Sequence, residues 1–539
     1  MNFSAFQAIT DTNQWVILWP EITLGLIALL LLVLELVLPK ARHDIIPRVA
    51  VFGQLLVLIG VLWSLTQDGV DPLTQGDTEA SFFNGLIVLT AMSQAGRVFI
   101  LLTSLIVCHL AKLYFQRQAL PRVEFYHLVL VVTAAMMLLV QSAQFVLLFV
   151  ALETVTVGFY VLVAYCRPSP LSLEAGLKYL ILGALSSAIL LFGIVLLYGA
   201  VGAPDPVLAH TRFKHFGLAP DAMNFSVIGD YITSHPANPL VVIGAILVLC
   251  GIAFKIAAVP FQVWVPDVYQ GAPSPTTALL AVASKAAGFL VLLNLVTGPF
   301  AGLAHSVLVP LLSTLAVLSI LFGNLAALTQ RNVKRVMGLS GIAHAGYMLV
   351  GVVAVAQGVS WAAAAVMFYL FTYLLGSLAV FGVMAHVAGP HDETQELEHY
   401  LNLGKRQPFL GAILAIGLGS LAGIPPLAGF IGKLLIFFAA FQAHLYGLIG
   451  VSIVGVVISI YYYFGWIREA LFRAPGVTSL SEAPEAAFVT SPSSWSRLTL
   501  GLLAAATLFL GLYQGFFSES SVQATQNFTR PIHVKASLH

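Results

Sequence analysis

The stretch GIAFKIAAVPFQVWVP, residues 251–266, decides the fold class because it carries a charge inside an apolar run. Lys255 has apolar neighbours for more than a turn on either side, and Pro260 follows five positions later. A lysine at the centre of a bilayer costs about 2.5 to 3.5 kcal/mol on insertion scales, so a chain that keeps one has a use for it. A proline in a helix interior removes a backbone hydrogen bond. The stretch therefore predicts a broken membrane helix with a buried ammonium.

A second stretch, GIPPLAGFIGKLLIFFAA at residues 423–440, repeats the combination, with Lys433 following Pro425 and Pro426. Backbone groups freed at membrane depth are tolerated only where they face protein or water. Freed carbonyls beside an ammonium make a local polar pocket. The alternative is a structural kink with a lysine that reaches the headgroups. We favour the pocket, because Lys433 and Lys255 each stand more than two turns from either end of their apolar runs.

The composition agrees with a membrane location. Of 539 residues, 59% are hydrophobic and 9% are charged, too few charges for an ordinary soluble surface. The net charge of +1 gives no reason to expect a nucleic-acid partner. The three cysteines lie in apolar stretches without paired spacing, so no disulfide framework, iron–sulfur site or attached haem is expected.

Windows of about 20 apolar residues predict an all-α polytopic protein of about 14 transmembrane helices, of which the seventh and twelfth are broken. Their centres lie near residues 27, 57, 106, 133, 155, 187, 250, 286, 318, 346, 373, 425, 456 and 506. If the spans alternate, one set of connections holds fifteen of the 24 Lys and Arg residues, and the opposite set, which includes Arg97, holds five. The positive-inside rule then places both termini on the periplasmic side of a bacterial inner membrane. The longest connections, 200–238, 387–407 and 468–494, are expected to be loops.

Two further titratable groups lie in the middle of spans. Glu153 is central in QFVLLFVALETVTVGFYVLVAYC, residues 144–166, and a glutamate buried there without a cation would serve little structural purpose. Lys285, in TTALLAVASKAAGFLVLL at residues 276–293, has no carboxylate within a turn, so its partner must come from another helix. The alternative for Lys285 is a structural lysine bonded to backbone carbonyls. We expect both side chains to take part in moving an ion.

Other charged positions are more ambiguous. Lys178 has Glu174 four residues before it, which is also the spacing of an ordinary helix ion pair. His344 lies near the middle of a span, where a lone histidine is often a satisfied core residue. Glu21 and Glu35 lie toward opposite ends of the first span, where interfacial water reaches them, and we expect both to be structural.

The energies involved suit proton transfer. A carboxylate at about 4 Å from a lysine changes the energy of the charged lysine by about 4 kcal/mol at an effective dielectric constant of about 20. Moving one proton against roughly 150 mV requires about 3.5 kcal/mol. A Glu–Lys contact that forms and breaks is therefore strong enough to load and eject a proton.

The order of these groups repeats along the chain. Glu153 and Lys255 lie in spans five and seven, and His344 and Lys433 lie in spans ten and twelve. Two units of five helices fit this order, and an odd number forces the second unit to be inverted in the membrane. The predicted division is 1–120 for the first three helices, 121–297 for the first repeat, 298–467 for the second repeat, and 468–539 for a linker, the last helix and the tail.

Three runs carry a resemblance to a known family: residues 251–285, residues 423–437, and RVMGLSGIAHAGYMLVG at 335–351. They resemble the antiporter-like membrane subunits of respiratory complex I, the proton-pumping NADH:quinone oxidoreductase, over roughly residues 10–515. The chain is most similar to the N type, because Lys433 stands where the M type has glutamate and the long lateral helix of the L type is absent.

The resemblance implies a polar axis through the membrane, made of Glu153, Lys178, Lys255, Lys285, His344 and Lys433. Glu153 and Lys255 would be the coupled pair of one half-channel. Lys285 would be the bridge, and Lys433 the terminal group of the other half. It also implies no cofactor in this chain, with NADH, flavin, iron–sulfur clusters and quinone held by partner subunits. The partners would include neighbouring antiporter-like subunits and a small subunit in the same lipid bilayer.

Three functions remain in competition. The first is proton translocation driven by quinone reduction in the partner subunits. The second is a subunit of a multi-subunit cation/proton antiporter, although sodium transport predicts clustered carboxylates and the spans here are rich in lysine. The third is a structural membrane anchor whose charges only pair with neighbours.

Overall fold

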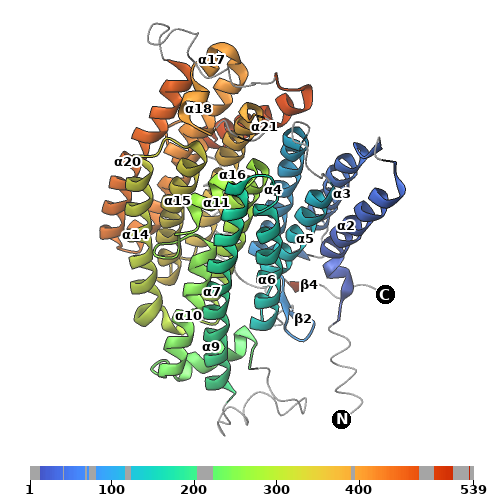
Figure 1. Cartoon of the computed structure of the whole chain (residues 1–539). Helices are drawn as coiled ribbons and strands as arrows, with labels where there is room; N and C mark the ends of the chain where they lie inside the picture. Colours follow the sequence, from blue (N-terminus) through green and yellow to red (C-terminus); the bar gives the residue numbers. More distant parts are fainter. Residues whose placement is uncertain are drawn as a thin grey trace.

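A computed structural model describes most of the chain and shows one bundle of helices running roughly side by side (Figure 1). The residues it describes are 13–39, 42–66, 70–71, 81–115, 123–202, 222–389, 392, 395–472, 491–513 and 533–534. Much of the predicted linker at 468–494 and several of the expected loop cations, Lys40 and Arg117 among them, lie outside these residues.

The helices follow one another in the order expected from the apolar windows. The first group comprises η1 (Trp15–Leu18), α2 (Trp19–Val37), α3 (Ile45–Thr66), α4 (Ala91–Phe115), α5 (Val123–Leu139), α6 (Phe145–Val163), α7 (Pro170–Val201), α9 (Phe225–Ser234), α10 (Pro239–Lys255), α11 (Val265–Gly271), α12 (Ser274–Leu279), the π-helical turn η3 (Leu280–Ser284) and α13 (Lys285–Thr297).

The second group comprises η4 (Ala301–Leu303), the π-helical turn η5 (Ala304–Leu308), α14 (Val309–Ala327), α15 (Val333–Ala356), α16 (Ala362–Val387), η6 (Leu397–Tyr400), α17 (Leu403–Arg406), α18 (Pro408–Ala422), α19 (Ala428–Gln442), α20 (Tyr446–Leu471) and α21 (Ser494–Leu512). Strands in the described residues are two residues long. They pair as β1 (Val70–Asp71) with β4 (His533–Val534), and β2 (Ser81–Phe82) with β3 (Ile87–Val88), both antiparallel.

Within the described residues, eleven helices are long and apolar enough to cross a membrane, and four shorter apolar helices accompany them. The all-α membrane fold is therefore confirmed. Every expected span centre falls in a helix except the one near 425, which falls in the break between α18 and α19. The exact number of crossings and the inverted repeats stay predictions.

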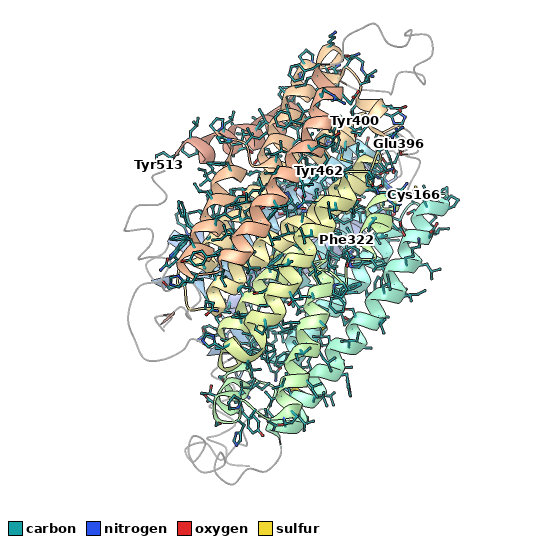
Figure 2. All side chains as sticks on the ribbon, turned by 90° about the vertical axis from the view of Figure 1, so that its left-hand side faces the viewer. Cys166, Phe322, Glu396, Tyr400, Tyr462 and Tyr513 are labelled. Atoms are coloured by element: carbon teal, nitrogen blue, oxygen red, sulfur yellow. The ribbon has the colours of Figure 1, made fainter. Side chains whose placement is uncertain are left out.

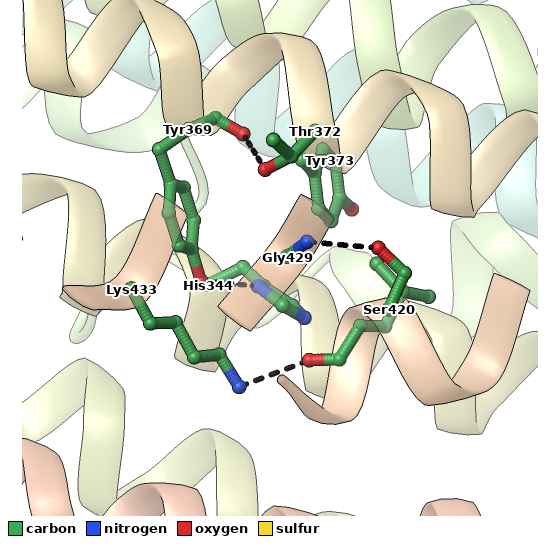
Figure 3. Close-up of a pocket in the computed structure, with 8 residues that line it drawn as sticks. His344, Tyr369, Thr372, Tyr373, Ser420, Gly429 and Lys433 are labelled. Atoms are coloured by element: carbon green, nitrogen blue, oxygen red, sulfur yellow. Dashed lines mark hydrogen bonds between the residues drawn. The ribbon is translucent and has the colours of Figure 1, made fainter. Parts of the chain in front are cut away.

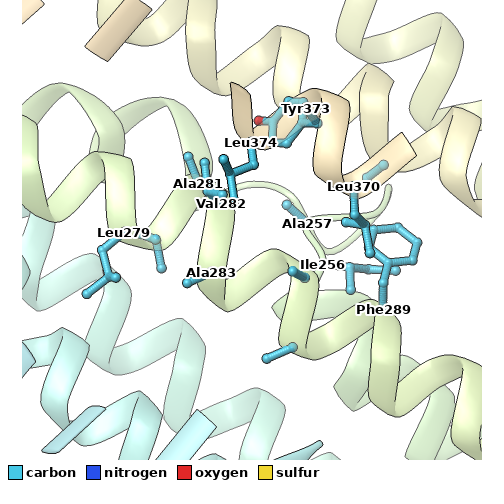
Figure 4. Packing of buried hydrophobic residues seen from close by; sticks show 14 of the residues in the cluster. Ile256, Ala257, Leu279, Ala281, Val282, Ala283, Phe289, Leu370, Tyr373 and Leu374 are labelled. Carbon is cyan, nitrogen blue, oxygen red and sulfur yellow. The ribbon is translucent and has the colours of Figure 1, made fainter. Parts of the chain in front are cut away.

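Helices α13, α15 and α16 form the centre of the bundle, and nearly all their residues are buried. Figure 4 shows Val282 and Ala281 close to Leu374 of α16, and Phe289 of α13 close to Leu370. Helices that are apolar on every side must face protein or lipid. The outer helices accordingly expose large apolar side chains, of which Phe322 on α14 is labelled in Figure 2.

Two helices are interrupted beside a lysine. Helix α10 ends at Lys255, residues 256–264 form turns that include Pro260, and α11 begins at Val265. Helix α18 ends at Ala422, and α19 begins at Ala428 after a segment with two prolines. Both breaks lie where the prolines predicted them.

Arg97 corrects the sequence-based assignment of charges to connections. It lies inside α4 rather than in a loop, and its guanidinium contacts the Glu21 carboxylate of α2 at 2.9 Å. Gln141 also donates to Glu21, at 2.8 Å. Glu21 was expected to be hydrated at an interface, but it is 5% exposed and paired with Arg97. The pair joins α2 to α4.

The expected loops also contain helices. The connection 200–238 includes the amphipathic helix α9, whose Phe225, Ile228 and Ile232 are buried. The connection 387–407 includes η6 and α17. These segments are too short to register in a 20-residue apolar window, so the sequence pattern did not predict helices there.

Helix α7 packs directly on α10 through a pair of glycines. A Cβ atom at Gly193 would lie 2.8 Å from the Gly244 carbonyl oxygen, and one at Gly244 would lie 3.0 Å from the Gly193 carbonyl oxygen. Small residues at such a crossing let two membrane helices approach backbone to backbone.

The glycine contact gives a first prediction. Gly193→Ala should lower the free energy of unfolding by about 1–3 kcal/mol, because the added methyl group has no space between α7 and α10. Gly199→Ala in the same helix is the control, since nothing lies within 4 Å of a Cβ there. Thermal unfolding of the detergent-solubilised protein measures both. Equal midpoints for the two variants would contradict the close packing.

Candidate functional site

Lys255 lies at the C-terminal end of α10, buried among α6 and α13 side chains. Its ammonium donates a hydrogen bond to the Thr156 hydroxyl of α6. The helix C-terminus is the negative end of the helix dipole, which favours a cation. The break immediately after Lys255 therefore gives the ammonium both room and a favourable field.

The backbone polar groups on either side of the break after Lys255 form hydrogen bonds with neighbouring side chains. The Val259 amide donates to the Ser319 hydroxyl of α14 at 2.9 Å, and the Trp264 indole donates to the Phe254 carbonyl at 3.2 Å. Irregular backbone at membrane depth requires such partners. The interruption is thus a built part of the fold, with its polar groups directed into protein.

Glu153 lies one turn before Thr156 on α6, so the two side chains share a helix face. Its carboxylate accepts a hydrogen bond from the Ser187 hydroxyl of α7. Among the described residues, no ion pair joins Glu153 to Lys255. Glu153 and Lys255 therefore do not contact each other directly. Glu153 bonds the Ser187 hydroxyl, and Lys255 bonds the Thr156 hydroxyl one turn further along α6.

Lys178 belongs to a different environment from the other lysines. Its ammonium lies 2.6 Å from Glu174, the predicted partner, and also 2.6 Å from Asp267 of α11. Asp267 in turn contacts Arg335 of α15 at 3.1 Å. The Lys178 side chain is 42% exposed. It is part of a surface charge network that ties α7, α11 and α15 together.

Lys285 is the first residue of α13, directly after the π-helical turn η3. Its ammonium donates to the Gly341 carbonyl of α15 at 2.6 Å and lies 5.2 Å from the centroid of the Tyr373 ring of α16. The partner comes from another helix, as predicted, but it is a backbone carbonyl, which is the contact expected from the structural alternative for Lys285. Single π turns occur frequently at functional sites.

His344 of α15 is buried between two tyrosines. Its Nδ1 is 2.8 Å from the Tyr369 hydroxyl, and its Nε2 is 3.2 Å from the Tyr463 hydroxyl of α20. A neutral imidazole has one donor and one acceptor nitrogen, so each tyrosine takes the complementary role. His344 can therefore pass a proton from one hydroxyl to another.

Lys433 lies in α19, just past the second break. Its ammonium donates to the carbonyls of Leu421 at 2.9 Å and Ala422 at 2.8 Å, at the end of α18. The first of these hydrogen bonds is drawn as a dashed line in Figure 3. It also lies 5.2 Å from the centroid of the Tyr347 ring. These carbonyls are free because the helix stops, so the predicted polar pocket of carbonyls and an ammonium is present.

Small cavities lie beside two of the lysines. One of about 10 Å³ is lined by Lys433, His344, Ser420 and the rings of Tyr369 and Tyr373, and Figure 3 shows these side chains around it. Another of about 10 Å³ is lined by apolar side chains with Lys255 and Ser284. This volume is about the least that holds one water, and the first cavity offers several polar partners for it.

The structure brings Lys285, His344 and Lys433 to the centre of the bundle, together with side chains that were not predicted from the sequence. The buried tyrosines are the main omission, because an aromatic residue in an apolar run is most often core. Asn324 of α14 belongs to the same network, since it bonds the hydroxyls of Tyr347 and Tyr462. The sequence did contain one indication of this network, because an asparagine in the middle of an apolar span is a polar group that needs buried partners.

A second buried ion pair was also missed. Lys334, assigned to a connection, lies in the first turn of α15 with 1% side-chain exposure and pairs with Asp392. Its ammonium also donates to the Ala272 carbonyl at 3.0 Å. Tyr114 and Ser274 donate to Asp392 at 3.1 and 3.4 Å. Fifty-eight residues separate the two charges in the chain, so their spacing in the sequence did not predict the pair.

Known proteins with similar sequences decide the family. A family model described as NADH:quinone oxidoreductase/Mrp antiporter, TM, matches residues 142–459. NADH-quinone oxidoreductase subunit N 1 of Opitutus terrae is 55% identical over 520 residues, which are 96% of this chain and 98% of that protein. The chain belongs to the subunit N family. The predicted resemblance is thereby confirmed.

Solved structures agree with this family. A chain of respiratory complex I from Thermus thermophilus is 31% identical, with a TM-score of 0.71 over 92% of this chain and 97% of that one. A chain of the Mrp complex from Dietzia sp. DQ12-45-1b is 20% identical with a TM-score of 0.75 over 96% and 98%, which shows a shared fold alone. A second family model, described as nicotinamide mononucleotide transporter, matches residues 424–538, about a fifth of the chain, which is too little to show a family.

Two carboxylates of this chain give a second prediction. Asp392→Ala leaves Lys334 buried without a counter-charge and should cost about 3–5 kcal/mol of stability. Asp267→Ala removes contacts of side chains that are about one-third exposed and should cost about 1 kcal/mol or less.

Thermal unfolding at low and high salt separates the two. The Asp267 effect should shrink at high salt, because exposed pairs are screened, whereas the Asp392 effect should persist. A larger loss at Asp267 than at Asp392 would contradict the burial on which the prediction depends.

Proposed function

We propose that this chain is a proton-translocating subunit of an NADH:quinone oxidoreductase in a bacterial inner membrane, driven by quinone reduction in partner subunits. The observation that carries the proposal is Lys433, whose ammonium binds two carbonyls at a helix break and borders a water-sized cavity shared with His344. Buried ammonium groups of this kind mark ion pathways in membrane proteins.

The proton path uses the predicted axis in order. With Glu153 close, Lys255 takes a proton from the cytoplasm. When Glu153 is drawn toward a neighbouring subunit, Lys255 passes the proton on through Lys285 and His344. Lys433 receives it and releases it on the periplasmic side.

The arrangement around α6 supports the first of these steps. Glu153 bonds to Ser187 while Lys255 bonds to Thr156, so neither charged group is locked to the other. A carboxylate approaching a lysine to about 4 Å contributes about 4 kcal/mol at an effective dielectric constant of about 20. That is enough to move a proton against a potential of roughly 150 mV, which needs about 3.5 kcal/mol. Lys178, on the surface network, serves proton entry at the cytoplasmic end.

The division into two inverted repeats, 121–297 and 298–467, belongs to the same proposal. In the first unit, α7 and α10 meet through Gly193 and Gly244; in the second, α16 and α18 meet through Gly376 and Gly417. Each pair precedes a helix break beside a lysine. Repeated broken helices near the membrane midplane are typical of transporters built from inverted repeats.

Electron carriers are assigned to the partners. NADH, flavin, iron–sulfur clusters and quinone belong to other subunits, and this chain contributes the proton path alone. Neighbouring antiporter-like subunits and a small subunit flank it in the membrane. The end of the bundle that bears Arg331, Lys334 and Arg335 faces the cytoplasm, and both termini are periplasmic.

Replacement of Lys433 tests the exit of the path. In the assembled complex in proteoliposomes, Lys433→Ala should lower proton translocation driven by NADH oxidation at least about tenfold, because the terminal proton acceptor is lost. Lys405→Ala, an exposed lysine in α17, is the matched control and should translocate protons like the parent.

The same assay separates the competing functions. A structural anchor keeps full translocation in Lys433→Ala once the complex is assembled, which would overturn the proposal. A sodium/proton antiporter subunit makes the translocation depend on sodium concentration, whereas the proposed proton path works equally in potassium or choline buffer.

The contact between Lys255 and Thr156 gives another prediction. Thr156→Val keeps the shape but removes the acceptor of the Lys255 hydrogen bond, so proton translocation should fall severalfold. Thr154→Val is the control on the same helix, since the exposed Thr154 hydroxyl donates to the Val150 carbonyl of its own helix. Equal rates for the two variants in the proteoliposome assay would remove Thr156 from the path.

A further inference from the structure

The C-terminal end of α10 is formed by a turn in which an alanine has an unusual backbone conformation. Ala257 has a φ of +63°, in the left-handed region, and is 1% exposed. Its amide donates to the Phe254 carbonyl at 3.1 Å, and the Ala258 amide donates to the Ala253 carbonyl at 2.9 Å. These two hydrogen bonds around a left-handed residue are the Schellman motif, which closes many helix C-termini. Glycine is the usual residue at the left-handed position, and here it is replaced by alanine.

The break beside Lys433 is closed by the same motif with the usual residue. Gly423 has a φ of +83°, and its amide donates to the Ser420 carbonyl at 3.0 Å. The Ile424 amide donates to the Gly419 carbonyl at 3.1 Å. Glycine adopts the left-handed conformation without a steric clash, whereas a residue with a Cβ atom adopts it only at a cost in free energy. The first break therefore carries backbone strain that the second break lacks.

Pro260 alone does not place the end of α10 at Lys255. A proline disfavours the helical conformation in the residue before it, which leaves residues 256–258 able to continue the helix. With Ala257 in the ordinary helical conformation, α10 would extend for most of another turn. Lys255 would then lie within the helix, and its ammonium would lose the field of the helix C-terminus that favours a cation. The strained turn at Ala257 is thus what ends the helix at the lysine.

A strained conformation persists only where surrounding groups hold it, and Trp264 provides such a contact. Its indole N–H donates to the Phe254 carbonyl at 3.2 Å, and the same oxygen accepts the Ala257 amide. In a continuous helix this carbonyl would accept the Ala258 amide instead. The Trp264 ring is 3% exposed and packs on the Phe254 ring at 5.5 Å and on the Tyr179 ring of α7 at 4.9 Å between centroids. The indole therefore holds the carbonyl that the turn uses.

We propose that Trp264 and Ala257 are positioning residues that end α10 at Lys255. The indole holds the strained turn, and the turn places the ammonium at the helix C-terminus, where it donates to the Thr156 hydroxyl. The inference rests on the proton path proposed above and adds the residues that position its first lysine. Neither Trp264 nor Ala257 carries a proton in the path, because both act through Lys255.

Trp264→Phe removes the indole N–H and retains an aromatic ring. In the assembled complex in proteoliposomes, proton translocation should fall severalfold, because the turn loses the group that holds it. Trp466→Phe is the matched control. The Trp466 indole nitrogen is buried without a hydrogen-bond partner among the described residues, and its ring packs edge-on against Tyr400. Both variants are compared at equal amounts of assembled complex.

Ala257→Gly tests whether the indole acts through the strained turn. Glycine takes the left-handed conformation unaided, so the double variant Trp264→Phe with Ala257→Gly should translocate protons severalfold faster than Trp264→Phe alone. Ala258→Gly in the same Trp264→Phe background is the control for adding a glycine to this segment, and it should give no recovery. A packing defect left by the smaller ring would not be repaired by removing one more methyl group.

A second comparison tests whether the effect passes through Lys255. If Trp264 acts by placing Lys255 beside the Thr156 hydroxyl, Trp264→Phe should reduce translocation much less in a Thr156→Val background than in the parent. Substitutions that affect one shared contact are not additive in free energy, whereas two independent defects multiply their effects on the rate.

The outcomes separate this inference from the proposed function. If Lys255→Ala abolishes translocation while Trp264→Phe translocates like the parent, the positioning role is wrong and the axis stands. If Lys255→Ala itself translocates like the parent, the proposed function fails. If Ala257→Gly restores the Trp264→Phe variant no better than Ala258→Gly does, or if Trp264→Phe causes the same loss in both backgrounds, Trp264 serves packing alone and the inference is overturned.

Discussion

The structure depends on how a buried ammonium is stabilised where no carboxylate is bonded to it. Lys433 donates to two carbonyls that a helix break has released, Lys285 donates to one carbonyl, and Lys255 donates to a hydroxyl. Taking a charge out of water costs several kcal/mol, and neutral dipoles return only part of it. Each ammonium is therefore held firmly in place while its charge remains responsive to a carboxylate that approaches or leaves.

Two other buried cations of this protein, unlike the three lysines, are each paired with a carboxylate. Arg97 with Glu21, and Lys334 with Asp392, are buried ion pairs whose further hydrogen bonds come from neighbouring helices. Removing either partner of such a pair is costly, so both pairs fix helices relative to one another. The three central lysines lack such partners among the described residues, and this separates the fixed charges from those suited to transfer a proton.

Much of this arrangement follows from the sequence. A lysine or glutamate in an apolar run is rare, and a nearby proline interrupts the helix. The spans, both breaks and the carbonyl pocket of Lys433 were predicted on those grounds. The partners were not predictable. Asp392 and Lys334 are far apart in the chain, and Tyr373 differs from a core aromatic residue only through its neighbours. Arg97 was placed outside its span because the polar residues before it ended the apolar window early.

The unbroken helix α15 gives the centre of the molecule its geometry. Lys334, Gly341 and His344 all lie on α15. The buried pair of Lys334 with Asp392 at one end of this helix therefore fixes the positions of the Gly341 carbonyl and of His344 along the helix axis. A rigid helix held this way cannot change those distances by itself. The interrupted segments next to Lys255 and Lys433 differ from α15, because their backbone hydrogen bonds go to neighbouring side chains and to an ammonium rather than to the next turn. In the proposed proton path, Glu153 acts on Lys255 at such a break, against the scaffold that α15 provides.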